Sequence, residues 1–372
     1  MKKTKLHPSN FKTLHLSMLC SLLFFTCAGK VEKHASLLKH KIEKSKIHVD
    51  SISMRAETLS EFKVDVHDKE FQGNQISGVV RTVFQDKKGN FWFGSQNGLC
   101  RKDQSGLVYF DLKDAAGQSV TVHVILEDNV GNIWIGYGGG IAKYDGAYFT
   151  NFHQKDILTT GGLWSMTMDK KGTLWIGTTN GVFTFDGEAL IPFEIPEGKV
   201  NPNMGISSSK MVHSIMEDSQ GRMWFGTNGG AYIYDGKTLK NISKKNGLLS
   251  NFVHQIIEDS KGNYWISTSE GLFEYDGNAL INRSESLYKT DEGVGCVFED
   301  KNGTIWFTAN RRDIYCYKDQ KFTKINIEVG NNGPMPFQIY QDNRDRIWFV
   351  GFKGAYRLDN EKFVNINRNG PW

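Results

Sequence analysis

The chain is poor in cysteine and proline. Its 372 residues include 5 cysteines and 7 prolines. Cys100, Cys296 and Cys316 fall in the body of the chain, and their odd number and spacing fit neither a disulfide framework nor a zinc site. We therefore expect these three residues to be buried as small hydrophobic side chains. The shortage of proline and the 12% content of aromatic residues fit an ordered, β-rich body.

A strong charge of either sign is also missing. The chain has 45 lysine and arginine residues against 41 aspartate and glutamate residues, which gives a formal charge of +4. Four of the lysines, at positions 2, 3, 5 and 12, lie at the extreme N-terminus, so the charges of the remaining chain balance. Because binding to nucleic acid requires a basic field, we expect no nucleic-acid partner.

Motifs of the common enzyme classes are absent as well. The sequence contains no Gly-x-Ser-x-Gly, no glycine-rich phosphate loop, no His-Glu-x-x-His and no EF-hand loop. Kinase signatures and a second apolar span are missing too. These motifs therefore assign no catalytic residue, no metal ligand and no cofactor.

The N-terminal segment has the pattern of an export signal. The lysines precede an apolar run, Leu14 to Phe25, that is too short for a membrane-spanning helix. Two endings fit residues 1–27: Cys27 could carry a lipid, as in bacterial lipoproteins, or cleavage could follow the small-x-small site Thr26-x-Ala28. The polar, lysine-rich residues 28–58 are interpreted as a linker. We expect a periplasmic or cell-envelope protein that meets the membrane only through such a lipid anchor.

Seven copies of Asp-x-x-Gly-x-x-Trp dominate the rest of the chain, with one glycine replaced by Asp345. Their tryptophans are Trp92, Trp134, Trp175, Trp224, Trp265, Trp306 and Trp348. Successive gaps are 42, 41, 49, 41, 41 and 42 residues. A period near 40 residues is typical of four-stranded propeller blades. Residues 59–372 are therefore predicted to form an all-β, seven-bladed β-propeller with four antiparallel strands in each blade.

The fifth copy shows how one repeat becomes one blade. Strands are expected at 253–258, 263–267, 272–275 and 279–282. Asp259 begins a tight turn and Gly262 closes it, while Asp276-Gly277 is a two-residue hairpin signal. A turn explains all seven aspartates without a ring of metal ligands, and the tryptophans are expected in the core between blades. Because each repeat is a whole blade, the ring has no obvious strand exchange at closure, and Phe62, Val64 and Val66 are proposed to supply a closing strand.

The residue five places before each Asp varies among the repeats, unlike the structural positions. This series reads Arg81, His123, Trp164, His213, His254, Gly295 and Phe337. Because it lies at the loop-bearing end of the channel, its cationic, imidazole and aromatic groups suit a polar or anionic ligand with a stacking face. Glu270 is added to this ligand-binding set as a neighbouring loop residue, and the 49-residue gap places an insertion around Pro196 to Lys210 there. The alternative is that each histidine only bonds to a neighbouring blade.

Segments such as 253–266, followed by 271–277, resemble the two-component regulator propeller repeat. Such propellers form periplasmic sensors of hybrid histidine kinases and often sense glycans. This sequence differs in having one propeller and no kinase, regulator domain or membrane helix. The repeat also resembles that of streptogramin (virginiamycin B) lyases, whose paired histidines and magnesium ion imply a lyase acting through His213 and His254.

Three hypotheses follow. The first is a non-catalytic propeller that binds a small molecule, an oligosaccharide or a cell-envelope protein on its loop-bearing rim. The second is a metal-dependent lyase, which requires a carboxylate within metal-binding reach of His213 and His254. The third is a purely structural scaffold of the cell surface that binds no small molecule.

Overall fold

The computed structural model describes residues 46–60, 72–153, 162–202, 205, 207–285, 287, 293–310, 312–326 and 333–372. The chain divides into two compact units, Met1–Ile47 and His48–Trp372, and only Lys46 and Ile47 of the first unit are described. The expected signal peptide and the proposed closing strand at Phe62, Val64 and Val66 lie outside the described residues.

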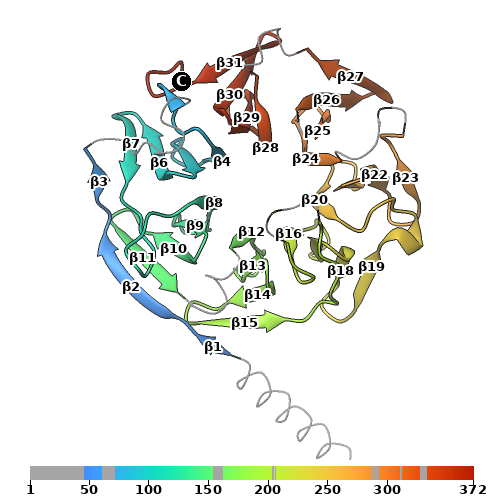
Figure 1. The fold of residues 1–372 in the computed structure, drawn as a ribbon, viewed down its shortest axis with the longest axis horizontal. Coiled ribbons are helices and arrows are strands. Elements are labelled where there is room, and N and C mark those ends of the chain that lie inside the picture. The colour runs from blue at the N-terminus through green and yellow to red at the C-terminus, as the bar shows by residue number, and fades with distance from the viewer. Residues whose placement is uncertain are drawn as a thin grey trace, which may run out of the picture. The chain divides into compact units, whose positions relative to one another are not determined.

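Residues 80–366 form seven antiparallel sheets arranged around a central axis (Figure 1). Blade 1 contains β4 (Val80–Gln85), β5 (Phe91–Ser95), β6 (Gly98–Asp103) and β7 (Gly106–Phe110), and blade 2 contains β8 (Val122–Glu127), β9 (Ile133–Tyr137), β10 (Gly140–Tyr144) and β11 (Tyr148–His153). Blade 3 contains β12 (Leu163–Met168), β13 (Leu174–Thr178), β14 (Gly181–Phe185) and β15 (Ala189–Phe193), and blade 4 contains β16 (Val212–Glu217), β17 (Met223–Thr227), β18 (Gly230–Tyr234) and β19 (Leu239–Ile242).

The 3-10 helix η1 (Lys244–Asn246) leads from blade 4 toward blade 5. Blade 5 contains β20 (Val253–Glu258), β21 (Tyr264–Thr268), β22 (Gly271–Tyr275) and β23 (Leu280–Asn282), and blade 6 contains β24 (Val294–Glu299), β25 (Ile305–Ala309), β26 (Asp313–Lys318) and β27 (Lys321–Ile325). Blade 7 contains β28 (Met335–Gln341), β29 (Ile347–Phe352), β30 (Gly354–Asp359) and β31 (Lys362–Ile366). The first strand of each blade lies next to the axis and the next three lie successively further out, which confirms the predicted seven-bladed propeller (Figure 1).

Each repeated aspartate closes its turn and also holds the repeated tryptophan. In blade 5, Asp259 Oδ1 accepts the backbone N–H groups of Lys261 at 3.0 Å and Asn263 at 2.8 Å, while Oδ2 accepts the indole N–H of Trp265 at 3.0 Å. The same Asp–Trp bond recurs in the other six blades at 2.8 to 3.0 Å. The interpretation of the aspartates as turn residues is confirmed, whereas the bond to tryptophan was not anticipated from the sequence.

The tryptophans pack between blades, as expected. Trp224 of blade 4 is 1% exposed and belongs to one buried cluster with Val253, Ile256 and Tyr264 of blade 5. Its ring stacks on that of Tyr264 with centroids 4.1 Å apart. Buried aromatic pairs of this kind contribute about 0.5–1.5 kcal/mol beyond the area that they bury.

Neighbouring blades are also joined by the residue before each aspartate. Glu258 Oε2 of blade 5, for example, accepts the N–H of Ser219 in the Asp turn of blade 4 at 2.6 Å. Glutamate or glutamine makes the equivalent bond at five further junctions, through Glu127, Glu217, Glu299, Gln341 and Gln85. At the junction of blades 2 and 3 this position is Met168, which has no hydrogen-bonding side chain.

Replacing Met168 with glutamine is expected to stabilise the ring. The amide oxygen would accept the N–H of Asn129, as Gln341 accepts that of Lys301. One such hydrogen bond contributes about 0.5–1.5 kcal/mol. Urea denaturation of Met168→Gln beside Met168→Leu measures the effect, because leucine keeps the apolar packing without the acceptor. Equal free energies of unfolding for the two variants would contradict the expectation.

Residues 47–58, expected to belong to the polar linker, and Leu59 form three short strands outside the ring: β1 (Ile47–His48), β2 (Asp50–Arg55) and β3 (Thr58–Leu59). β2 pairs with β11 over six residues and β3 pairs with β7, so blades 1 and 2 each gain a fifth strand. The N–H of Val49 donates to the carbonyl of Glu188 beside blade 3. Backbone groups make these pairings, which is why the exposed side chains of β2 give little sign of a strand.

Blade 7 meets blade 1 without exchanging a strand within the described part of the chain. Gln338 Oε1 accepts the N–H of Val83 at 2.7 Å, and the N–H of Gln85 donates to the Tyr340 hydroxyl at 3.1 Å. Isolated bridges pair Gln75 with Asn367 and Val79 with Phe352. Side-chain acceptors and single bridges therefore join the two ends of the ring.

Candidate functional site

A β-bulge interrupts the first strand of every blade at the same place. In blade 4, Val212 faces Thr227 and Ser214 faces Gly226, so His213 between them has no partner in the ladder. The corresponding shift occurs in all the other blades. The skipped residues are Arg81, His123, Trp164, His213, His254, Gly295 and Phe337, and Cys296 is skipped as well in blade 6. Bulges redirect a side chain and are common beside functional sites.

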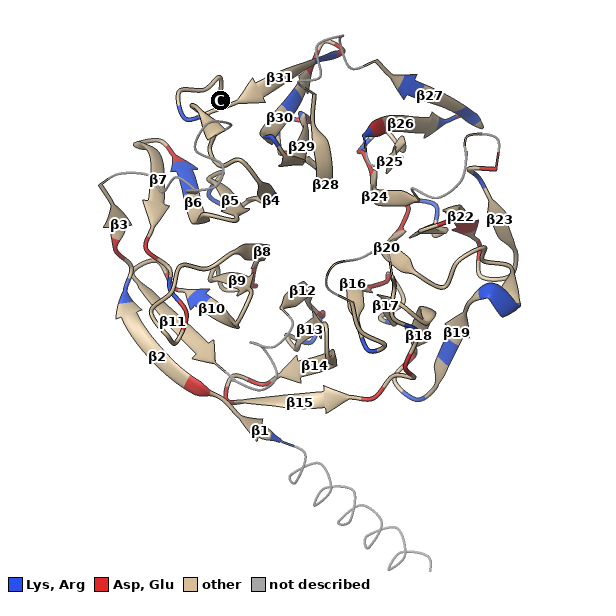
Figure 2. Cartoon of the chain, in the orientation of Figure 1, with Lys and Arg blue, Asp and Glu red and all other residues tan. Residues whose placement is uncertain are grey.

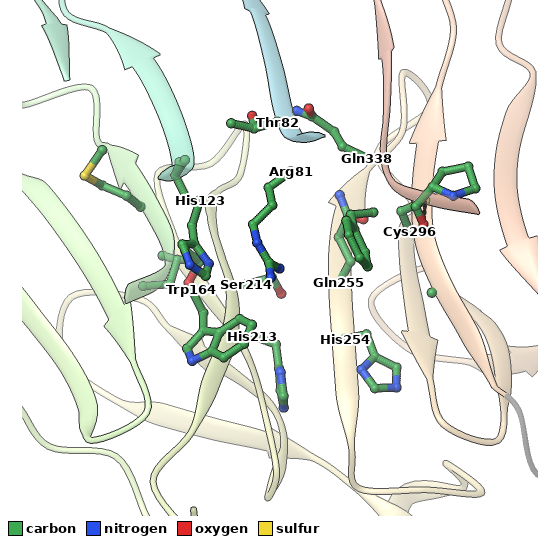
Figure 3. A pocket seen from close by; sticks show the side chains of 17 residues that line it. Arg81, Thr82, His123, Trp164, His213, Ser214, His254, Gln255, Cys296 and Gln338 are labelled. Atoms are coloured by element: carbon green, nitrogen blue, oxygen red, sulfur yellow. Dashed lines mark hydrogen bonds between the residues drawn. The ribbon is translucent and has the colours of Figure 1, made fainter. Parts of the chain in front are cut away.

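These seven residues line one cavity of about 480 Å³ in the centre of the ring. Figure 3 shows Arg81, His123, Trp164, His213 and His254 extending into this space from neighbouring first strands. The structure therefore brings together the ring of variable residues that the spacing singled out. Glu270 does not join them, because its exposed side chain lies in the turn between β21 and β22 and does not line the cavity.

A second ring of residues, 15 positions further along the chain, supports four members of the first. Trp164 donates its indole N–H to Thr179 Oγ1 at 2.9 Å, His213 Nε2 lies 2.7 Å from Asn228 Oδ1, and His254 Nε2 lies 2.9 Å from Ser269 Oγ. Phe337 meets Phe352 edge to face, with ring centroids 4.8 Å apart. Sequence reasoning missed the roles of Thr179 and Ser269, although the constant spacing of 15 residues could have revealed them.

Asn228 fixes the hydrogen-bonding state of His213. The Asn228 amide donates to Ser207 Oγ at 3.1 Å and to the Ser208 carbonyl at 2.8 Å, so its oxygen is left to accept from His213 Nε2–H. Burial lowers the pKa of His213, while the bond to Asn228 raises it by less. His213 is therefore a neutral imidazole with its lone pair on Nδ1. Ser207 and Ser208 belong to the expected insertion, which thus reaches the cavity through Asn228.

The other two histidines are neutral as well. Burial, with a smaller contribution from the nearby His213, lowers the pKa of His254 to about 3. Burial lowers the pKa of His123 to about 4, with a second contribution from the positive charge of Arg81. The rings of His213 and His254 are 5.6 Å apart, and those of His123 and Trp164 are 5.3 Å apart.

Arg81 carries the one charge of the cavity lining among the described residues. Its Nε is buried without a hydrogen-bond partner, and its guanidinium lies 5.4 Å from the centre of the Phe337 ring. Burial lowers the pKa of Arg81, but a guanidinium remains protonated at neutral pH. No aspartate or glutamate lines the cavity in the part of the chain that the structure describes. The lining therefore presents a positive charge that no acidic side chain of the described lining neutralises.

The lyase hypothesis required a carboxylate near His213 and His254. Within the described ranges, no acidic side chain lines their cavity, and no group of three or more histidine, cysteine, aspartate or glutamate residues could hold a metal ion. The described lining thus offers two neutral imidazoles without the carboxylate that a metal-assisted elimination requires.

The cysteines follow the expectation in part. Cys100 and Cys296 are buried, whereas Cys316 is half-buried and departs from it. Cys296 lines the cavity, with its Sγ 3.5 Å from Thr308 Oγ1, and burial raises the pKa of this thiol to about 11. A thiol in this state is a weak nucleophile at neutral pH.

The architecture and the repeats agree with a known family. The family model described as two component regulator propeller matches residues 74–97, 158–180, 205–229 and 247–270. Each match ends at or beside the turn between the second and third strands of a blade. These four segments are similar to the two-component regulator propeller repeat. The resemblance stated from the sequence is thereby confirmed.

Solved structures with such regulator propellers are similar to this chain. The extracellular domain of the putative hybrid two component system BT3049 from B. thetaiotaomicron is 27% identical over 77% of this chain, with a TM-score of 0.56. That of BT4673 from the same organism is 18% identical over 82% of the chain, with a TM-score of 0.61. In each case the chain spans only 39% of the longer domain. No protein of curated function matches the sequence significantly.

A streptogramin B lyase shares the fold. It is 15% identical over 82% of this chain and 97% of its own length, with a TM-score of 0.59. An identity this low extends the likeness to the propeller architecture alone. Among the residues that the structure describes, no helix is long and apolar enough to cross a membrane.

Proposed function

We propose that this protein is an exported, non-catalytic, sensor-type propeller that binds a small polar ligand in its central cavity. The extracellular location of the similar regulator propellers supports export. The lysine-rich start and the apolar run from Leu14 to Phe25 support it independently. Occupancy of the cavity would be read by a partner protein of the cell envelope.

The convergence of seven variable bulge residues on one cavity carries this proposal. Positions that only build the blade keep one residue type, as the seven aspartates and seven tryptophans do. The bulge position instead presents a guanidinium, three neutral imidazoles and two large aromatic rings to the same space. Such a combination of a few polar groups with aromatic walls is typical of small-molecule sites.

The charge distribution supports a small ligand over a nucleic acid. Figure 2 shows basic and acidic segments interspersed around the ring. Exposed ion pairs such as Lys301 with Asp345 and Lys324 with Asp313 neutralise part of the surface charge.

A thermal-shift screen of the purified protein tests the proposal. The panel contains oligosaccharides, small organic anions and divalent cations. A ligand at 100 times its dissociation constant stabilises the folded state by about 2.7 kcal/mol, which raises the melting temperature visibly. We expect His123→Ala and Trp164→Ala to abolish the shift and Tyr148→Ala, an exposed residue of the outer strand β11, to leave it intact. A stabilising compound that acts equally on all three variants would contradict binding in the cavity.

Attachment to the membrane through Cys27 belongs to the same proposal. In a bacterial host, a lipid on Cys27 would place the mature protein in the membrane fraction. The Cys27→Ala variant would then be depleted from that fraction. Cleavage at Thr26-x-Ala28 without a lipid predicts a soluble periplasmic protein in both cases. Fractionation followed by mass spectrometry of the N-terminal peptide distinguishes the two endings.

A further inference from the structure

The support of the bulge residues is uneven around the ring. In blades 3, 4, 5 and 7 the residue 15 positions later holds the bulge side chain by a hydrogen bond or a ring contact. In blade 2 the equivalent position is Gly138, which has no side chain to hold His123. In blade 1, Arg81 Nε has no hydrogen-bond partner in the described part of the chain. Among the described residues, Arg81 and His123 therefore form a corner of the cavity in which Arg81 Nε and the His123 ring have no supporting hydrogen bond.

This corner combines a fixed cation with a neutral imidazole. Arg81 and His123 lie on β4 and β8, the neighbouring first strands of blades 1 and 2, and both line the cavity (Figure 3). Arg81 lies over Phe337 on one side, and the ring of His123 meets the Trp164 ring at an angle of 84°. A neutral imidazole offers one N–H donor and one lone pair, which match a hydroxyl group.

The single positive charge of the described cavity lining, on Arg81, favours a ligand with a single negative charge. A buried guanidinium N–H without an acceptor, such as that of Arg81 Nε, costs free energy that an anion can offset, and a guanidinium matches the two oxygens of a carboxylate in a planar fork. A phosphate dianion would need a second cation, and the described lining contains none besides Arg81. The aromatic rings of Trp164 and Phe337 provide apolar faces beside the anion site.

We infer that the cavity binds a hydroxylated monocarboxylate, such as a uronic acid, with its carboxylate on Arg81 and a hydroxyl group on His123. The inference rests on the proposed ligand-binding function and names the chemical class of the ligand. The carboxylate accepts two N–H groups of the guanidinium, including the buried Nε. The hydroxyl pairs with the free nitrogens of His123, and the sugar ring packs beside Trp164.

Titration calorimetry on the purified full chain tests this inference. The probes are D-glucuronate, D-galacturonate and N-acetylneuraminate, each beside its methyl ester, which has the same shape without the charge. Sodium acetate against sodium chloride at equal ionic strength gives a minimal probe of the anion site by thermal shift. The variants are Arg81→Gln, Arg81→Lys and the control Arg55→Gln, which removes an equal charge from the exposed strand β2.

We expect an acid to bind, its methyl ester to bind at least 10-fold more weakly, and acetate to raise the melting temperature more than chloride. Arg81→Gln should weaken binding of the acid by about 10-fold to 100-fold, as expected for the loss of hydrogen bonds to a charged group. Arg81→Lys should retain part of the affinity, and Arg55→Gln all of it. Without ligand, Arg81→Gln should melt no lower than the wild type, because it removes an unpaired charge.

Esters or neutral sugars that bind as tightly as the acids, or an Arg81→Gln variant that keeps its affinity, would overturn the carboxylate while leaving the proposed ligand-binding function in place. No detectable binding of the acids, the esters or acetate, together with no stabilising compound in the thermal-shift screen, would overturn both. Affinity for the acid that rises 10-fold between pH 8 and pH 6 would make a protonated histidine the partner of the anion and would also overturn the role of Arg81.

Discussion

Between pH 7 and pH 5 the propeller is expected to lose about 2 kcal/mol of its free energy of unfolding, roughly 1 kcal/mol for each of His123 and His254, and His213 adds to this loss in the same direction. Burial lowers the pKa of His123 to about 4, that of His254 to about 3, and that of His213 in the same direction. In the unfolded chain these imidazoles titrate near 6.5. As the pH falls below 6.5, the unfolded state therefore binds protons that the folded state does not take up.

The sign follows from this difference in proton binding. Stability rises with pH wherever the unfolded state holds more protons, so it is full above about pH 6.5 and falls progressively toward about pH 4. Aspartates such as Asp218 contribute little to the pH dependence of stability in this range, because their pKa values are held below the usual value and they titrate at lower pH. His153 in β11 also has its pKa lowered by burial and adds a smaller contribution.

Urea denaturation at pH 7 and pH 5 measures the loss. The triple variant His123→Asn, His213→Asn, His254→Asn should flatten most of the pH dependence, leaving the part that belongs to His153. Trp164→Phe is the matched control, because it alters the same cavity without changing a titratable group. A wild-type protein with equal free energies of unfolding at the two pH values would show that the three imidazoles accept protons in the folded state.

Replacing Asp218 with alanine is expected to destabilise the protein by about 3–5 kcal/mol. The Asp218 side chain is fully buried and accepts N–H groups from the turn, the guanidinium of Arg222 at 2.6 Å and the indole of Trp224 at 2.8 Å. It also accepts the hydroxyl of Tyr264 from the next blade at 3.2 Å. Burial raises the pKa of Asp218, but these donors together hold it below its usual value. Alanine would leave a partly buried cation and a buried indole N–H without an acceptor.

Asp169→Ala provides the matched comparison. Asp169 accepts the N–H groups of Lys171 and Thr173 and the indole N–H of Trp175, but it has no arginine four residues later and no contact of this kind with the next blade. Its loss should cost about 2 kcal/mol, because neutral hydrogen bonds contribute less than charged ones. Chemical denaturation of both variants, analysed with a common m-value, shows which substitution lowers the free energy of unfolding more. Equal losses would mean that the ion pair and the bond between blades contribute nothing.

Much of the architecture could be predicted because it depends on local, repeated chemistry. The spacing of Asp259 and Trp265 fixed the turn and the central strand of blade 5, and β20 begins and ends at the expected residues. The ring of bulge residues could also be predicted. A position that varies inside a strict repeat is one at which the blade does not require a particular residue type. The bulge itself could not, because it arises from pairing with the second strand and has no sequence signature.

The outer strands β2 and β3 could not be predicted for a related reason. They pair through backbone groups along exposed edges, so their side chains keep the polar character of a linker. The link from the insertion to His213 through Asn228 depends on contacts between segments that no repeat relates. Glu270 was predicted to line the ligand site because it lies in a loop at that end of the channel. It follows Ser269, which supports His254, and its own side chain is exposed to solvent.

The pairing of β2 with β11 has a mechanical consequence. A force that pulls the chain along the axis of β2 would load all the backbone bonds of its six-residue register together, as in shear, instead of opening them one after another. Tension applied ahead of the ring, for instance by an anchor in the envelope, would thus be borne by the Val49 bond beside blade 3 and then by the β2 pairing on the flank of blade 2. The joint between blades 7 and 1, held by side-chain acceptors and single bridges, would be shielded from it.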